Sequence, residues 1–305
     1  MADVVGIGCA VFDMMLIVDE FPVEDTKCSG LDSKIQCGGP CAVAMIAASK
    51  LGVQSKMIVK QGDDTYGKTI KERLGFYGVD TTDVTLVPDE KSSVCVVISN
   101  QSNSSRTCVG GGGGRGAGLV LKPEDIDLEA IKNAKYLHVD GMNYDAAVYA
   151  AKKAHEFGTK VSMDVDGYNP NMEELLTLVD EMIPSEKFAY RFSGTDDVEE
   201  AAMIVYNKFK PDVLIVTQGP KGGVVVQDGV LTHYKAFKVN AIDTNGAGDV
   251  FHGGYVAARI KGMDVLTAVR FASATSAIKC THFGASEGAP HFDDVVKFLE
   301  EHQEA

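Results

Sequence analysis

The sequence predicts an α/β protein built on one mostly parallel sheet with helices on both faces, and three observations lead to this fold class. Short β-branched apolar runs alternate with amphipathic helical patterns along most of the chain. The runs are continuously apolar, as is typical of strands buried on both faces. The 305 residues are 45% hydrophobic and 24% charged, which suits one large core with an appendage.

The first half begins with the apolar run VVGIG at 4–8, followed by a helical pattern at 40–52 that ends in glycine. A second apolar run, KMIVK at 56–60, precedes another helical pattern at 65–78, which also ends in glycine. Because each helix follows one strand and leads to the next, this alternation is typical of βαβ units, whose strands run parallel.

The alternation resumes after residue 135. It covers YLHVD at 136–140, a helix at 144–158, KVSMDVD at 160–166, a helix at 198–209, DVLIVTQG at 212–219, and helices that begin near Gly246 and Asp264. In such a sheet the carboxyl ends of the strands face a ligand crevice, so we expect the functional residues there.

Two segments, residues 11–37 and 91–110, interrupt the alternation. They contain short strand-like stretches such as MMLIVDEF and SVCVVISN with no helix between them. We expect these segments to pair into a small antiparallel lid on a single domain that spans residues 1–305.

The formal net charge of −14 argues against binding to nucleic acid or to an acidic membrane surface, because no block of Lys and Arg offers a basic footprint. The seven cysteines form no CxxC pair and no metal-ligand spacing, which fits reduced thiols. The start MADVVGIGCAVFD has no basic stretch followed by a long apolar one, so we expect no secretory leader there, and no run of about 18 apolar residues is present to span a bilayer. We therefore expect a cytoplasmic protein with a small-molecule partner.

The stretch DTNGAGDVFHGG at 243–254 carries the strongest functional signal. Gly246, Ala247 and Gly248 lie where a turn passes into an amphipathic helix. Their N–H groups can therefore point together at an anion from the positive end of the helix dipole. Asp249 lies in the first turn, where we expect the dipole to lower its pKa and keep the carboxylate ionised at neutral pH.

A purely structural interpretation of this stretch is the alternative. Asp243 or Thr244 would then cap the helix, the glycines would be turn residues, and Asp249 would only offset the dipole. A cap does not need glycines on both sides of an alanine, however, so the combination favours the functional interpretation.

At these residues the chain resembles the ribokinase, or PfkB-type, carbohydrate kinases. DTNGAGDVFHGG is similar to the family's carboxyl-terminal signature, CGGPCAVAMIAASKLG at 37–52 is similar to its amino-terminal one, and TQGPKGG at 217–223 lies in the expected place. KSS at 91–93 and AIKCT at 277–281 look closest to sulfofructose kinases and other ketose-directed members. The resemblance covers essentially the whole chain and implies a ribokinase-like three-layer α/β/α sandwich with a small β-sheet lid.

The resemblance implies ATP-dependent transfer of the γ-phosphoryl group to a hydroxyl of a small sugar, with a ketose or ketose derivative as the first candidate. Asp249 would accept the hydroxyl proton. Gly246, Ala247 and Gly248 would hold the charge that develops on the phosphoryl group. This chemistry depends on positioning and on oriented N–H donors more than on covalent help.

For the sugar, the resemblance implies that Asp13 accepts hydrogen bonds from two hydroxyls and that Gly38 and Gly39 place backbone against the ring. By themselves, the same residues would also suit a surface aspartate and a tight βα turn. Lys27 and Arg106 lie in the two lid segments, where a cation can meet an anionic group of the substrate. Solvated lid surface is the alternative for both.

For the nucleotide, Thr217, Gly219 and Gly222 resemble the family's phosphate loop, because glycine lets the backbone approach the phosphates. Thr244 and Glu186 are further ATP-binding candidates. Magnesium is implied by ATP chemistry itself, and the sequence predicts no dedicated metal site.

Asp243 and Thr281 match positions where relatives hold a monovalent cation, so the resemblance leaves room for a potassium ion. Three positions depart from the family pattern. Val43 replaces a sugar-binding Asn and offers no hydrogen bond, which leaves the orientation of the sugar open. SEKF at 185–188 retains little of the NxxE motif linked to magnesium, so the ion would be held mostly through water and ATP. Asn245 replaces a Thr and keeps a polar side chain.

Three other functions compete with a sugar kinase. A nucleoside kinase would need an apolar slot for a base beside Asp13, for which the lid offers Phe12 and Phe21. A catalytically idle ligand-binding protein on the same fold would have no use for Asp249. A dinucleotide-binding dehydrogenase would need a full GxGxxG motif, which GIGCAVFD lacks. Short exposed edge strands on a lid would also favour a homodimer through the lid.

Overall fold

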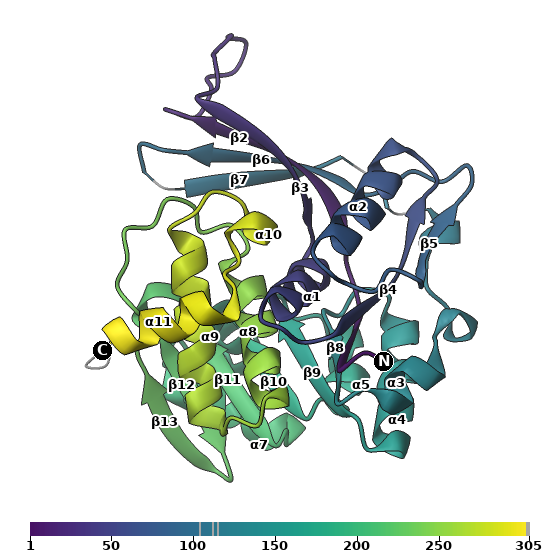
Figure 1. Ribbon diagram of the computed structural model, residues 1–305. Helices are drawn as coiled ribbons and strands as arrows, with labels where there is room; N and C mark the ends of the chain where they lie inside the picture. The colour runs from purple at the N-terminus through teal and green to yellow at the C-terminus, as the bar shows by residue number, and fades with distance from the viewer. Residues whose placement is uncertain (104, 112, 115, 303–305) are drawn as a thin grey trace.

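The computed structural model describes residues 1–103, 105–111, 113–114 and 116–302, and its centre is a twisted sheet between two layers of helices (Figure 1). Ser104, in the second predicted lid segment, lies outside the described residues. Within them the main sheet has nine strands in the order β13-β12-β11-β10-β9-β8-β1-β4-β5. Their bounds are β1 (Val4–Ile7), β4 (Ser55–Gly62), β5 (Val84–Val87), β8 (Tyr136–Val139), β9 (Lys160–Val165), β10 (Glu181–Pro184), β11 (Val213–Thr217), β12 (Gly223–Gln227) and β13 (Val230–Tyr234).

Seven neighbouring strands of this sheet, from β5 to β11, pair in parallel, and β12 and β13 add an antiparallel edge. The residues of β1, β8 and β10 are buried throughout. Burial on both faces explains why these strands are continuously apolar or nearly so instead of alternating. The predicted mostly parallel sheet is confirmed.

Helices cover both faces of the sheet and complete a three-layer sandwich. One face carries α1 (Pro40–Lys50), α2 (Thr65–Phe76), α8 (Ala247–Ile260), α9 (Val265–Cys280) and α11 (Phe292–Glu301). The other carries α3 (Leu128–Asn133), α4 (Tyr144–Phe157), α5 (Glu173–Leu176), α6 (Glu186–Ser193) and α7 (Val198–Phe209). Short connections form α10 (Ala285–Gly288), η1 (Ala117–Leu119), η2 (Pro123–Asp125), η3 (Pro170–Met172) and η4 (Gly219–Lys221).

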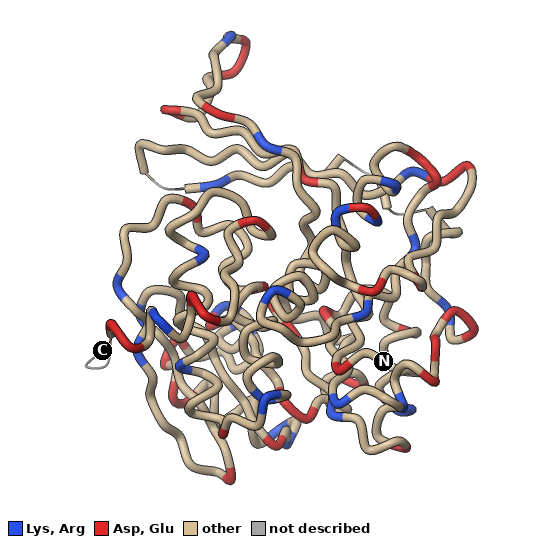
Figure 2. The backbone as a smooth tube through the Cα atoms, in the orientation of Figure 1, with Lys and Arg blue, Asp and Glu red and all other residues tan. Residues whose placement is uncertain are grey.

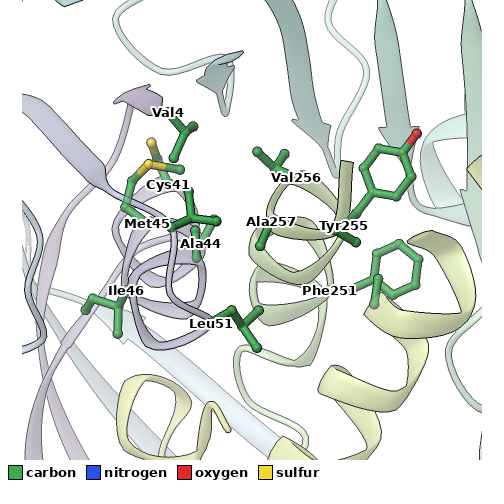
Figure 3. Close-up of a cluster of buried hydrophobic side chains, with 14 of the residues drawn as sticks. Val4, Cys41, Ala44, Met45, Ile46, Leu51, Phe251, Tyr255, Val256 and Ala257 are labelled. Atoms are coloured by element: carbon green, nitrogen blue, oxygen red, sulfur yellow. The ribbon is translucent and has the colours of Figure 1, made fainter. Parts of the chain in front are cut away.

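Helices α1 and α8 pack closely against each other, which fixes the position of the α8 start. Figure 3 shows Ala44 of α1 and Ala257 of α8 facing each other between the two helices. A Cβ on Gly253 would clash with the backbone carbonyl of Ala44. Gly253 of the HGG sequence therefore allows the close approach of α1 and α8, whereas Gly254 faces Ala272 and Thr275 of α9.

A second sheet lies over one end of the sandwich (Figure 1). It pairs β3 (Asp32–Gly38), β2 (Val11–Val18), β6 (Val94–Asn100) and β7 (Ser105–Gly110) in that order. These strands fall in the two segments that interrupt the alternation of strands and helices. The prediction that the two segments pair as an antiparallel lid is wrong in one respect, because β2 and β6, which join them, run parallel, and only β2–β3 and β6–β7 are antiparallel. Both β2 and β6 follow strands of the parallel sheet, β1 and β5, so they leave it in the same direction. Because β2 follows β1 after three residues, the second sheet starts beside the carboxyl end of a central strand.

Charged residues of both signs are interspersed along the backbone (Figure 2). Against the net charge of −14, attraction of an anion needs a local device, such as a helix N-terminus or a positioned cation. Each cysteine that the structure describes is a free thiol. In the described part of the chain, no helix has the length and apolar character needed to cross a bilayer.

Candidate active site

The stretch predicted to bind an anion forms the start of helix α8. Gly246 precedes the first turn and adopts the left-handed conformation with a φ of 73°, which glycine accommodates without strain. A Cβ on Gly246 would clash with the Cβ of Ala285, whereas a Cβ on Gly248 would meet no atom within 4 Å. The first glycine is therefore required by the fold, and the second leaves open space where a ligand can approach.

Among the described residues no side chain caps α8. Asp243 instead accepts a hydrogen bond from the backbone N–H of Asn245 (2.9 Å), and Thr244 accepts one from the second sheet. The structural alternative, in which Asp243 or Thr244 caps the helix, is therefore wrong. The N–H groups of Gly248 and Asp249 have no acceptor earlier in the helix, so they are available to an anion.

Asp249 lies in the first turn of α8, partly buried among other carboxylates. Burial and the negative charge of Asp164 raise its pKa to about 7, against the opposing charge of His252. The prediction that the helix dipole keeps this pKa low is wrong, because burial and neighbouring charges outweigh the dipole. A carboxylate with this pKa is basic enough to accept a hydroxyl proton near neutral pH.

Asp164, near the end of β9, forms a buried ion pair beneath Asp249. Its Oδ1 lies 3.2 Å from Nε2 of His252. Burial alone would raise the pKa of Asp164, but the imidazole outweighs it and the pKa is lowered. Burial alone would lower the pKa of His252, but Asp164 and Asp249 outweigh it and the pKa is raised. The pair therefore places a fixed carboxylate beside the predicted base.

Asp140 follows β8 and is a second buried carboxylate that sequence reasoning did not single out. It accepts hydrogen bonds from the N–H groups of Cys9 (2.6 Å) and Cys41 (3.2 Å), and burial raises its pKa to about 6. A Cβ on Gly8 would lie 2.5 Å from this carboxylate. The available signal was that YLHVD and KVSMDVD each place an aspartate at the carboxyl end of a strand, where ligands bind.

Asp13 in β2 is buried beside the two glycines predicted to touch a sugar. Burial raises its pKa to about 6, although Nε2 of Gln36 donates a hydrogen bond to it (3.3 Å). A Cβ on Gly38 would clash with this carboxylate. Gly39, with a φ of 94°, is the residue before α1, and a Cβ there would lie 2.6 Å from the carbonyl of Cys9. The structure therefore brings Asp13, Gly38 and Gly39 together.

Four of the five predicted nucleotide-binding residues lie where β11 ends and α6 begins, and they are Thr217, Gly219, Gly222 and Glu186. The fifth, Thr244, lies apart from them in the loop before α8, where it binds Arg106. Glu186, in the first turn of α6, accepts a hydrogen bond from the side-chain amide of Gln218 (3.1 Å), which follows Thr217 in the chain. Gly219 and Gly222 have φ angles of 55° and 92°. Positive φ angles explain the need for glycine in this loop, and the structure brings the first four residues close to one another.

The two predicted substrate cations have different surroundings. Nη1 of Arg106, on β7, donates a hydrogen bond to Oγ1 of Thr244 (3.0 Å), and Asp243 lines the same pocket. Lys27 is exposed on the connection between β2 and β3, which projects beyond the second sheet in Figure 1. No hydrogen bond or ion pair joins Lys27 to another described residue. The structure therefore brings Arg106, and not Lys27, to the start of α8.

Asp243 and Thr281 do not fit a potassium ion in this structure. The buried ammonium group of Lys279 donates a hydrogen bond to the backbone carbonyl of Asp243 (2.6 Å) and lies 3.5 Å from its carboxylate. The hydroxyl of Thr281 donates to the carbonyl of Ile278 (2.7 Å). A cation already lies against Asp243, and a second one beside it would be repelled.

Two departures from the family pattern have structural roles here. Val43 is buried and packs in a small apolar cluster with Val250 and Ala285, so its side chain stabilises α1 against α8 and α10. Ser185 precedes α6, and its hydroxyl accepts a hydrogen bond from the N–H of Phe188 (3.4 Å). The side chains of Val43 and Ser185 therefore take part in packing and helix capping.

Comparison with known proteins identifies the family. The family model described as "pfkB family carbohydrate kinase" matches residues 1–291. An ATP-dependent ribose-1-phosphate kinase from Halopiger xanaduensis is 29% identical over 304 residues, which are 99% of each chain. The crystal structure of a candidate ribokinase from Agrobacterium tumefaciens has a TM-score of 0.93 at 26% identity and covers 100% of this chain and 99% of its own.

The ribokinase of Arabidopsis thaliana, solved in complex with ribose and ATP, has a TM-score of 0.84 at 25% identity, with 98% of this chain and 99% of that chain covered. The predicted ribokinase-like sandwich is confirmed. The chain belongs to the pfkB family of carbohydrate kinases and is an ATP-dependent phosphotransferase that acts on sugar hydroxyl groups.

Proposed function

We propose that this kinase binds a small sugar between Asp13 and Asp249 and transfers the γ-phosphoryl group of ATP to one of its hydroxyls. The start of α8 carries the proposal. It combines uncapped N–H groups, open space at Gly248 and a carboxylate with a pKa of about 7 within one turn. One turn then supplies both the base and the anion-binding donors that phosphoryl transfer needs.

In the proposed reaction, Asp13 accepts hydrogen bonds from sugar hydroxyls and orients the ring against Gly38 and Gly39. Asp249 takes the proton of the reacting sugar hydroxyl while the oxygen of that hydroxyl forms a bond to the γ-phosphorus. The bond to the bridging oxygen of ADP breaks, and the charge on the transferred group is stabilised by the N–H groups of Gly248 and its neighbours.

Magnesium would enter with ATP. Asp164 and Asp249 offer the hard carboxylate oxygens that this ion prefers, and Asp164 keeps 16% of its side chain exposed. The described residues form no group of three or more His, Cys, Asp or Glu that could hold a metal by themselves. This arrangement fits an ion held mainly by phosphate oxygens and water, where it would neutralise the phosphate charge.

A ketose or ketose derivative remains the first candidate substrate, supported by the likeness of the sequences at 91–93 and 277–281 to ketose-directed kinases. Ribose and ribose 1-phosphate are the competing candidates, because the names of two relatives refer to them. A nucleoside is disfavoured. Phe12 is buried against Tyr66, with ring centroids 4.8 Å apart, so it does not line a slot for a base.

A screen of ADP release tests this proposal. The enzyme is incubated with ATP, magnesium and one acceptor from each class: ketoses, aldoses, sugar phosphates, sulfosugars and nucleosides. We expect release to depend on a sugar of the ketose or pentose class and to disappear in the Asp249→Asn variant. Preferential turnover of a nucleoside, or no acceptor-dependent release in any class, would contradict the proposal.

Arg106 is proposed to contact an anionic substituent when the substrate carries one. Its guanidinium group lies at the pocket between β7 and the loop before α8, in an otherwise acidic chain. We expect Arg106→Ala to raise KM more for a phosphorylated or sulfonated sugar than for its neutral parent. Lys27→Ala is the matched comparison. It should raise KM for the anionic sugar in the same way only if the β2–β3 connection folds over the bound sugar.

The outer face of the second sheet is proposed to pair with a second copy of this chain. Strand register places five apolar side chains on the part of this face that lies away from the core, and they are Leu16, Ile35, Val96, Ile98 and Val109. Exposed fractions of 38% for Leu16, 47% for Ile35 and 55% for Val109 are high for large apolar residues. Gln36 and Lys34 point to the opposite face, where they contact Ala285 and Phe283 of the body of the protein.

Light scattering after size-exclusion chromatography tests the dimer. The wild-type protein should elute as a dimer and Ile35→Glu as a monomer. Phe76→Glu, at an equally apolar exposed position on α2 (76% exposed), is the matched control and should leave the dimer intact. A monomeric wild type, or an Ile35→Glu dimer, would contradict the proposal.

A further inference from the structure

Lys279 is a fully buried lysine at the carboxyl end of α9, with none of its surface exposed to solvent. Its Nζ donates a hydrogen bond to the backbone carbonyl of Asp243 (2.6 Å) and lies 3.5 Å from the carboxylate of the same residue. A lysine is rarely buried without a charged partner. Because Lys279 contacts Asp243, in the loop that leads into α8, we looked for a functional role for its charge.

One face of α9 presents two side chains to the first residue of α8 and to the loop that precedes it. Ser276 and Lys279 are three residues apart, so they lie on the same face of the helix. The hydroxyl of Ser276 donates a hydrogen bond to the carbonyl of Ala247 (2.8 Å), and Lys279 holds the carbonyl of Asp243. Two hydrogen bonds from α9 thus fix the backbone on both sides of Gly246.

Asp243 connects Lys279 to the sugar side of the site. Its Oδ1 accepts the N–H of Asn245 and its Oδ2 accepts the N–H of Gly284, each at 2.9 Å. The next residue, Ala285, donates its N–H to Oε1 of Gln36 (2.9 Å). Because Gln36 also donates to Asp13, a continuous set of contacts runs from the buried ammonium group to the predicted sugar-binding carboxylate.

The positive charge itself also has a role beside a phosphate site. Nη1 of Arg106 is bound to Thr244, so two cations converge on neighbouring residues of the loop that begins the anion-binding turn. A fixed positive charge in a desolvated position stabilises negative charge that develops nearby. Burial lowers the pKa of Lys279, and the carboxylate of Asp243 opposes this shift by favouring the charged ammonium.

We propose that the ammonium group of Lys279 serves as a built-in monovalent cation that fixes the Asp243–Asp249 loop, so that turnover does not need a free potassium ion. The tests of this proposal that measure turnover rest on the proposed kinase function, and the test that measures thermal unfolding does not. It follows from the mismatch between the expected potassium ligands and the structure, because Lys279 and backbone N–H groups already use the oxygens of Asp243.

The first test measures wild-type turnover of the best substrate with ATP and magnesium in potassium, sodium or tetramethylammonium chloride at constant ionic strength. We expect rates within about twofold of one another, since a tethered ammonium does not exchange with the salt. Activation of the wild type by about fivefold or more in potassium alone would overturn the proposal. This arm needs no variant, so it does not depend on whether a substitution folds.

The second test uses Lys279→Ala, which removes the ammonium and opens space for a small cation. We expect a loss of about tenfold or more in tetramethylammonium chloride, with recovery when potassium or ammonium chloride replaces it. Lys50→Ala is the matched control, because Lys50 also donates to backbone carbonyls, those of Ser286 and Glu287, without touching Asp243. Full activity of Lys279→Ala in all salts would overturn the proposal.

Thermal unfolding gives a readout that needs no substrate. Potassium should raise the unfolding temperature of Lys279→Ala relative to tetramethylammonium, and it should not do so for the wild type or for Lys50→Ala. If Lys279→Ala does not fold, Lys279→Gln is measured in the same salts. A potassium-specific shift in the wild type would overturn the inference even when no sugar is turned over, so its failure is distinguishable from failure of the kinase function.

Discussion

Replacement of Asp249 by Asn is expected to remove catalysis and, above neutral pH, to stabilise the folded protein. The isosteric amide keeps the shape of the side chain but does not accept a proton, so kcat should fall by about 10² to 10⁴. The gain in stability follows from the environment of the carboxylate, which raises its pKa from 3.8 to about 7.

The raised pKa fixes the sign of the stability effect. The neutral carboxyl contributes fully to stability below about pH 4, and this contribution is lost as the pH rises through about 7, where the folded group ionises. A shift of about three units corresponds to at most ~4 kcal/mol. Partial exposure of Asp249 and the nearby charge of His252 reduce the expected gain at pH 8 to about 1–3 kcal/mol.

Scanning calorimetry of the ligand-free protein at pH 5 and pH 8, together with ADP release, measures both effects. Asp249→Asn should unfold about 2–6 °C above the wild type at pH 8, with a smaller difference at pH 5. Asp196→Asn, at an exposed position between α6 and α7, is the control and should change neither quantity. Normal turnover of Asp249→Asn, or a stability difference that does not grow with pH, would refute the reasoning.

Three further predictions concern the same site. The value of kcat/KM should rise with pH and level off above about 7, because the carboxylate of Asp249 must be unprotonated in the free enzyme; a pH–rate profile that is flat down to pH 5 would contradict this role. Asp13→Ala should raise KM by an amount that corresponds to about 1–3 kcal/mol for each lost hydrogen bond, and steady-state kinetics identical to those of the wild type would remove Asp13 from the site. Gly246→Ala should lower the unfolding temperature, because it combines a φ of 73° with a clash at Ala285, whereas Gly248→Ala should unfold like the wild type and lose turnover; equal thermal stability of both variants would argue against this division.

Sequence alone predicted the parallel sheet, its two helical layers and the start of α8. Those features depend on local patterns: apolar runs, helix-ending glycines and a glycine-flanked turn into a helix. The family resemblance extended the prediction to Asp13 and to the glycines at 38 and 39, which the structure places together.

The electrostatics of the site could not be predicted from the sequence. The low pKa expected for Asp249 considered only its own helix, whereas its neighbours Asp164, Asp140 and Asp13 come from segments more than 80 residues away. The role of Lys279 could not be predicted for the same reason, because its partner Asp243 lies on a different segment of the chain. In the sequence it is one lysine in the last turn of a helix, and only the folded chain places its ammonium group against Asp243.

Identification of the product tests the central claim most directly. The enzyme is incubated with ATP, magnesium and the best acceptor from the screen, and phosphorus NMR follows both nucleotide and product. If the turn at Gly246–Asp249 transfers a phosphoryl group to a sugar, one sugar phosphomonoester should appear for each ADP, and Asp249→Asn should form neither. ADP accompanied only by inorganic phosphate, or a phosphomonoester formed at an unchanged rate by Asp249→Asn, would contradict the account.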